Sequence, residues 1–234
     1  GLRFWVSADA GKTTDPHGKL LLWKDLSGNG HDVTQADSGR RPIYVGKAIG
    51  EKPAIRFSGK KEFLKIKGQV IKGQEFTIIA VASDRSSSEE HREIISNWNG
   101  RAGNSTSSLF LGLTGKSTVR FSDDFSSNNK VISASGNPFI LSASSGSLGS
   151  QINFNGQTLA DRVSSLKERR IDTEWVIGQQ GNIEGEYWNG DIAELLVYGR
   201  QLEPQEMKSI SELLAKKYNL TMTHSLKKKS VMDP

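Results

Sequence analysis

Apolar and polar residues alternate with a period of two along most of this chain, and turn residues interrupt the alternation every ~8–12 residues. A period of two places every second side chain on the same face of a strand. Strands are therefore expected at residues 2–8, 54–58, 76–83, 94–98, 109–113, 119–121, 139–144, 151–154, 175–178 and 192–198. Between two short apolar runs, Asn155-Gly156 predicts a type I′ hairpin, because that turn needs positive φ at both central residues.

One segment near the C-terminus departs from this pattern. Pro204 suits the first turn of a helix, where a missing N–H costs nothing. The apolar residues that follow at helical spacing are Met207, Ile210, Leu213, Leu214 and Tyr218. Asn219 is placed to end this helix in a left-handed conformation.

Many short strands and a single amphipathic helix predict an all-β fold, a two-sheet antiparallel jelly-roll sandwich with the C-terminal helix packed on it. The domain is expected to span residues 1–220, and residues 221–234 to form a basic tail or linker.

Composition excludes several kinds of chemistry. The 234 residues include no cysteine, which rules out disulfides, thiol catalysis and Cys-ligated zinc. No apolar run approaches the ~20 residues of a membrane span. The net charge of +5 is scattered along the chain, so a nucleic-acid partner is not expected. The chain begins at Gly1 without a basic-apolar leader, as expected of an excised domain or a mature form.

Four blocks of sequence together carry a family resemblance. They read FWVSADA at residues 4–10, LWKDLSGNGH at 22–31, PAIRFSG at 53–59 and GDIAELLVYGRQL at 190–202. In this order and spacing the chain resembles the laminin-G-like, concanavalin A-like jelly-roll domains of exported bacterial proteins, from Leu2 to about Leu220.

That resemblance implies a function class and a location. Most such domains are non-catalytic modules that bind glycans or proteins, often with a structural calcium ion, and some branches are glycoside hydrolases. A secreted, periplasmic or cell-surface location is expected. The expected partners are a polysaccharide or cell-surface glycan, together with other domains of a parent protein.

The hydrolase alternative can be tested on the sequence. Hydrolases of this superfamily that use a Glu-x-Asp-x-x-Glu strand take both catalytic carboxylates from it. Here Asp191 and Glu194 match the second and third positions, but Asn189 occupies the nucleophile's place, and an amide cannot form the glycosyl ester. Glu184 and Glu186 are interpreted as solvated loop charges. The chain is therefore predicted not to be an enzyme.

A glycine-rich loop at residues 25–30 has two interpretations. Asp25 and Asn29 offer the oxygen ligands that calcium prefers, and the resemblance would add Asp191 or Glu194. Strand alternation points those last two to opposite faces unless a bulge intervenes. In addition, Ala193 stands where many relatives have Asp. The alternative is a plain turn whose Asp and Asn side chains bond to the backbone.

Sugar recognition needs an aromatic platform and planar polar groups. Trp5, Trp23 and Trp175 lie in alternating strands and are expected in the core. The candidate ligand-binding residues border polar or glycine-rich loops: Trp98, Asn99, Arg101, Tyr187 and Trp188. The aromatic residues among them have two possible roles, an exposed platform for a sugar or a buried anchor of the loop, and the sequence leaves both open.

The sequence thus predicts a non-catalytic carbohydrate-binding module of a larger exported bacterial protein. Two alternatives remain. One is a structural or protein-interaction domain without a glycan site, and the other is a glycoside hydrolase or lyase of the same fold.

Overall fold

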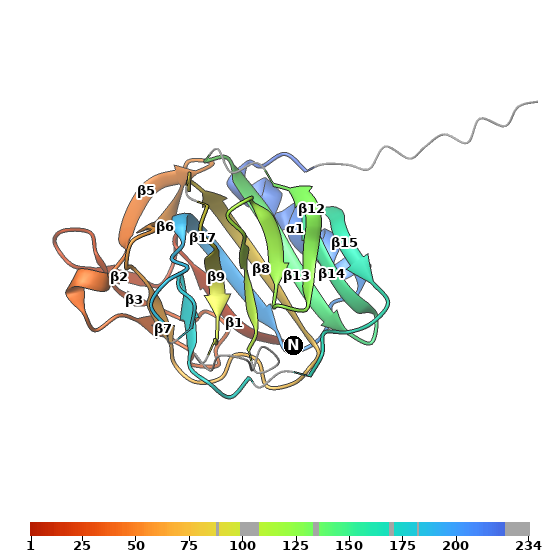
Figure 1. Cartoon of the computed structure of the whole chain (residues 1–234). Coiled ribbons are helices and arrows are strands. Elements are labelled where there is room, and N and C mark those ends of the chain that lie inside the picture. The colour runs from red at the N-terminus through yellow and green to blue at the C-terminus, as the bar shows by residue number, and fades with distance from the viewer. Residues whose placement is uncertain (88, 99–107, 133–135, 169–170, 182, 223–234) are drawn as a thin grey trace, which may run out of the picture.

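The computed structural model describes residues 1–87, 89–98, 108–132, 136–168, 171–181 and 183–222 (Figure 1). Two antiparallel sheets pack face to face, which confirms the predicted sandwich. Sheet A contains β1 (Leu2–Ser7), β5 (Ile43–Ile49), β6 (Lys52–Ser58), β8 (Phe76–Asp84), β13 (Pro138–Gly146), β14 (Gly149–Phe154), β15 (Gln157–Arg162) and β17 (Asn189–Tyr198). Its order is β15-β14-β13-β8-β17-β6-β5, and β1 pairs with the second half of β17.

Sheet B has the order β12-β11-β10-β9-β16-β7-β4-β3-β2. Its strands are β2 (Lys12–Thr14), β3 (Leu20–Trp23), β4 (Val33–Thr34), β7 (Leu64–Ile66), β9 (Arg92–Ser96), β10 (Phe110–Leu113), β11 (Thr118–Phe121), β12 (Phe125–Val131) and β16 (Trp175–Ile177). A short 3-10 helix, η1 (Ser38–Arg40), and the helix α1 (Pro204–Tyr218) complete the described elements. Within the described part of the chain, no helix combines the length and apolar character that crossing a bilayer requires.

The central strands of sheet A are buried on both faces, which explains their continuous apolar sequence. In β8, Phe76 and Ile78 enter the core between the sheets, whereas Ile79 and Val81 face a second apolar cluster on the outer side. All nine residues of β8 are buried. A strand covered on both sides buries apolar residues on both faces, as from Ile78 to Ala82, so strict alternation is lost there.

The second cluster belongs to α1, which lies behind sheet A in Figure 1. Met207, Leu214 and Tyr218 pack against sheet A, and Ile210 is partly buried there. Leu213 is 68% exposed, so its predicted place in the apolar stripe is wrong. It directly precedes Leu214, and consecutive residues point about 100° apart around a helix.

Two turn predictions are confirmed. Asn155 and Gly156 have φ of 47° and 80° and join β14 to β15, as a type I′ turn requires. Asn219 ends α1 with φ 52° and ψ 46°, the predicted left-handed cap. Trp23 and Trp175 are fully buried as expected, whereas Trp5 is only partly buried and packs on the outer, helix-side cluster.

Gly190 allows β17 to approach β8 closely. Its φ is 155°, and a Cβ built there would lie 1.9 Å from the carbonyl oxygen of Ser83. We expect Gly190→Ala to lower the free energy of unfolding by about 1–3 kcal/mol, because the backbone must shift to relieve the overlap. Chemical denaturation measures this. Gly185→Ala is the matched control, since Gly185 also has positive φ (128°) but nothing lies within 4 Å of its Cβ position. An equal loss in both variants would contradict the close-approach explanation.

Candidate functional site

The outer face of sheet B carries a row of polar residues, whereas α1 covers part of the outer face of sheet A. Neighbouring strands pair Glu93 with Gly112, Gly112 with Arg120, and Arg120 with Ser126. Gly112 leaves room for the Glu93 side chain, because a Cβ at Gly112 would lie 2.0 Å from Glu93 Oε2. We call Glu93, Trp98, Phe110, Arg120 and Glu186 the sheet B site.

A cavity of ≈ 350 Å³ borders this row. This volume is near the lower end of the range of about 300–1,000 Å³ for small-ligand pockets. It is lined by His91, Thr114, Thr118, Arg120, Ser122, Asp123, Asp124, Phe125, Ser126 and Asn128. Hydroxyl, amide and charged groups predominate, and such groups can bond to the hydroxyls of a sugar.

An aromatic pair lies beside Arg120. The rings of Trp98 and Phe110 meet edge to face, with centroids 6.2 Å apart, and the Arg120 guanidinium lies 4.5 Å from the centre of the Phe110 ring. Trp98 is partly exposed, whereas Phe110 is 1% exposed. The indole nitrogen of Trp98 is buried and has no hydrogen-bond partner among the described residues. Trp98 is therefore the aromatic side chain of this group that presents surface to a ligand.

Arg120 links two carboxyl groups. Its Nη1 lies 3.1 Å from Glu186 Oε2, to which it donates a hydrogen bond, and 3.3 Å from Glu93 Oε1. Glu93 is fully buried. Burial raises the pKa of Glu93 well above its ordinary value; the charge of Arg120 opposes this and that of Glu186 adds to it. Burial, together with the charge of Arg120, lowers the pKa of His91 at the cavity edge.

The enclosed position of Glu93 differs from that of a catalytic carboxyl group of a retaining glycosidase. Retaining glycosidases need two carboxyl groups about 5 Å apart that both reach the scissile bond. Glu93 has no exposed surface, so its carboxyl group is enclosed by the protein. Glu186 is ion-paired with Arg120 and its side chain is 22% exposed, so it is less solvated than its interpretation as a loop charge implies. Glu184 is 71% exposed, as expected.

The structure separates the predicted ligand-binding residues. Trp98 lies in the sheet B site. Trp188 is fully buried in the core between the sheets, so the buried-anchor alternative holds and Trp188 is corrected to a core residue. Tyr187 is partly exposed and is not among the residues that line the cavity. Asn99 and Arg101 lie outside the described residues.

The loop at residues 25–30 has the hydrogen bonds of a turn. Asp25 Oδ1 accepts from the backbone N–H groups of Trp5 and Ser27, and Oδ2 accepts from the Ser27 hydroxyl and the His31 N–H. These bonds outweigh the effect of burial and lower the pKa of Asp25. The Asn29 amide donates to the carbonyl oxygens of Leu2 and Arg3. Both side chains thus fasten the loop to β1.

Asp191 and Glu194 share the outer face of sheet A, because a bulge at Ala193 shifts the register between β17 and β8. Asp191 accepts two hydrogen bonds from Arg56. Glu194 accepts from the Trp5 indole, Lys217 and the Tyr218 hydroxyl. The carboxylates of Asp25, Asp191 and Glu194 therefore already accept hydrogen bonds from protein donors, and the Asn29 amide is bonded to backbone carbonyls. No group of three or more His, Asp or Glu suited to a metal occurs among the described residues. Calcium binding stays a prediction.

Sequence reasoning missed Glu93, Phe110 and Arg120. Their signal in the sequence is weak: Glu93 directly precedes the apolar pair Ile94-Ile95, and Arg120 lies between the core residues Val119 and Phe121. Only the pairing of β9, β10 and β11 brings the three together.

No protein-family model matches this sequence, and no curated protein matches it significantly. Solved structures do match. A sialidase from Trypanosoma rangeli has a TM-score of 0.64 at 14% identity, over 94% of this chain and 34% of the sialidase, so the chain spans about a third of that protein's length.

Two further matched structures are domains of larger proteins. Domain 4 of AbnA, a GH43 extracellular arabinanase from Geobacillus stearothermophilus, in complex with arabinotriose, has a TM-score of 0.60 at 14% identity, over 90% of this chain and 98% of that domain. The binding domain of Paraclostridial Mosquitocidal Protein 1 has a TM-score of 0.58 at 16% identity, over 91% of this chain and 52% of that one. At these identities the likeness shows the fold, a two-sheet β sandwich that the chain shares with carbohydrate-related domains.

Proposed function

We propose that this chain is a non-catalytic glycan-binding module of a larger exported protein, and that its sheet B site holds the sugar. The observation that carries the proposal is the partly exposed Trp98 ring, which packs on Phe110; the Arg120 guanidinium lies over the same Phe110 ring and lines a polar cavity. An aromatic face packs on the apolar face of a sugar ring, while the neighbouring hydroxyl and charged groups bond to its hydroxyls.

The matched structures support this proposal at the level of the fold. One of them, domain 4 of the arabinanase, is in complex with arabinotriose, and another is named a binding domain. The enclosed position of Glu93 supports a binding role rather than a catalytic one, since an acid that cannot reach the glycosidic bond cannot protonate it.

Trp98→Ala is expected to weaken glycan binding about tenfold or more, because truncating an aromatic anchor of a binding site costs on the order of 2 kcal/mol. The measurement is affinity gel electrophoresis against arabinan, sialylated mucin and a panel of neutral and acidic polysaccharides, followed by calorimetry on the retained ones. Analysis of the incubated polysaccharides for shortened products tests catalysis in the same samples.

The matched control is Trp5→Ala, which removes a partly exposed indole from sheet A and should leave binding unchanged in the folded protein. Retention of no polysaccharide would favour a protein-interaction domain instead. Shortened products would show an enzyme and overturn the non-catalytic proposal.

A further inference from the structure

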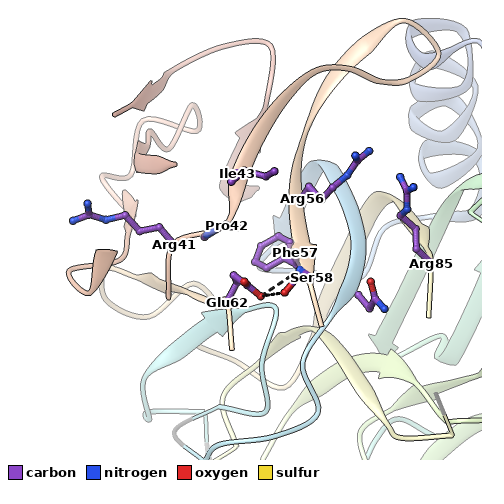
Figure 2. A pocket seen from close by; sticks show the side chains of 9 residues that line it. Arg41, Pro42, Ile43, Arg56, Phe57, Ser58, Glu62 and Arg85 are labelled. Atoms are coloured by element: carbon purple, nitrogen blue, oxygen red, sulfur yellow. Dashed lines mark hydrogen bonds between the residues drawn. The ribbon is translucent and has the colours of Figure 1, made fainter. Parts of the chain in front are cut away.

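A second cavity, of ≈ 330 Å³, opens at the end of sheet A (Figure 2). It lies where β6 ends and β17 begins, beside Arg85, which directly follows β8. Five of its residues come from β6, from β17 and from the position after β8: Arg56, Phe57, Ser58, Arg85 and Asn189. We call it the arginine pocket. The arginine pocket and the cavity beside the sheet B site have no lining residue in common, so they are distinct.

One buried carboxylate orients two half-exposed arginines in this pocket. Asp191 is the cross-strand partner of Arg56, and its carboxylate accepts bonds of 2.6 and 3.0 Å from Arg56 Nε and Nη2. Arg85 Nη1 lies 3.6 Å from Asp191 Oδ2, an ion pair beyond hydrogen-bond distance. The Asp191 side chain is 3% exposed, whereas those of Arg56 and Arg85 are 32% and 49% exposed. Figure 2 shows both arginine side chains extending in the same direction.

Asp191 does not use all the N–H donors of Arg56 and Arg85, nor does it balance both of their charges. Each guanidinium carries five N–H groups, and Asp191 accepts from only two of those of Arg56. The single negative charge of Asp191 balances one of the two guanidinium charges. Arg41 also lines the pocket, but its positive charge lies elsewhere. It donates to the carbonyl oxygens of Gln35 and Ala36, and in Figure 2 its side chain points away from Arg56 and Arg85.

The remaining walls suit a sugar ring. Ile43 is an apolar side chain that is 41% exposed, and Asn189 offers an amide. Glu62 is held by the Ser58 hydroxyl at 2.6 Å. Partial burial acts to raise the pKa of Glu62, but the bonds from Ser58 and from backbone N–H groups outweigh it and lower the pKa. Glu62 is therefore an ionised acceptor, which suits a ligand hydroxyl and disfavours a ligand carboxylate placed directly beside it.

We propose that the arginine pocket binds the carboxylate of a uronic acid residue in an acidic polysaccharide. A planar carboxylate matches the fork of N–H groups on Arg56 and Arg85, and its negative charge is attracted by the guanidinium charge that Asp191 does not balance. The inference rests on the proposal that the chain recognises glycans, and it adds the substrate class and a second contact on the other sheet.

The test is calorimetry with trigalacturonic acid, and with the neutral trisaccharide galactotriose as the probe without carboxylates, at about pH 7 and low salt. Arg85→Gln is expected to weaken trigalacturonic acid binding about tenfold or more, because a hydrogen bond to a charged group is lost. Arg85 is the better target, since Arg56→Gln also removes the main partner of buried Asp191. Arg85→Lys keeps the charge but loses the forked pair of N–H donors. Its affinity for trigalacturonic acid should therefore lie between those of the wild type and Arg85→Gln.

The matched control is Arg200→Gln, which makes the same charge change at a side chain that is 41% exposed, beyond the opposite end of β17. It should leave binding unchanged. Equal affinity for the two trisaccharides, or no effect of Arg85→Gln, would overturn the inference. Displacement of trigalacturonic acid by inorganic sulfate at an equal concentration would also overturn it, because the pocket would then bind oxyanions of any shape.

The outcomes separate this inference from the sheet B proposal. Weaker trigalacturonic acid binding in Arg85→Gln but not in Trp98→Ala supports the arginine pocket. If Trp98→Ala weakens that binding and Arg85→Gln does not, the proposed function stands and the arginine pocket inference falls.

Discussion

Arg92→Ala will lower the free energy of unfolding by about 3–5 kcal/mol, the usual effect of removing one partner of a buried ion pair. The Arg92 and Asp84 side chains are 2% and 0% exposed and share two hydrogen bonds. Arg92 also donates to the carbonyl oxygen of Thr114 and the hydroxyl of Ser117. Alanine at this position leaves the Asp84 carboxylate buried without its guanidinium. Chemical denaturation at neutral pH measures the loss.

This pair joins the end of β8 in sheet A to the start of β9 in sheet B, next to Glu93. Arg200→Ala is the matched control: its pair with Glu206 is 41% and 42% exposed, and such pairs contribute about 0–1 kcal/mol. The double variant Asp84→Leu/Arg92→Met should recover much of the loss, because well-packed apolar residues can replace a buried pair. A loss below about 1 kcal/mol in Arg92→Ala would show that Asp84 finds another partner.

Glu93→Gln will stabilise the protein increasingly as the pH rises. Burial keeps the Glu93 pKa of the folded state well above the ordinary value of 4.5, so the folded state retains a proton that the unfolded state releases. The stability linked to this proton is fully present below the unfolded pKa and is lost as pH rises toward the folded pKa, by up to about 1.4 kcal/mol per pH unit. Glutamine carries no such proton, so this loss is absent from the variant.

Denaturation curves at about pH 5 and about pH 8 measure this effect, with the difference between Glu93→Gln and wild type as the readout. Glu51→Gln is the control, since its side chain is 79% exposed and its difference from wild type should change little with pH. A Glu93→Gln difference that stays constant between the two pH values would contradict the raised pKa.

Local patterns were sufficient to predict much of the fold. The alternating segments form strands, Asn155-Gly156 forms the hairpin turn, and Pro204 and Asn219 bound the helix. Each of these depends on residues that are neighbours in the sequence, where backbone preference and side-chain period decide the conformation.

The site was harder to predict, because it depends on pairing between distant strands. Glu93 and Arg120 meet only through β10, and Gly112 must leave space for the Glu93 carboxyl group. The bulge at Ala193 turns Glu194 to the face of Asp191, which alternation alone does not predict. Trp188 follows a glycine-rich segment yet is buried in the core. The composition of a loop does not predict whether an aromatic side chain at its end packs inward or stays exposed.

The most direct test of the account is an amide NMR titration of the full chain with arabinotriose and with an oligosaccharide from each polysaccharide retained in the electrophoresis screen. The account predicts that a bound oligosaccharide shifts the amide signals of His91, Trp98, Arg120 and Ser126 on the outer face of sheet B. Shifts confined to α1 and the outer face of sheet A, or no shift with any glycan, would contradict it.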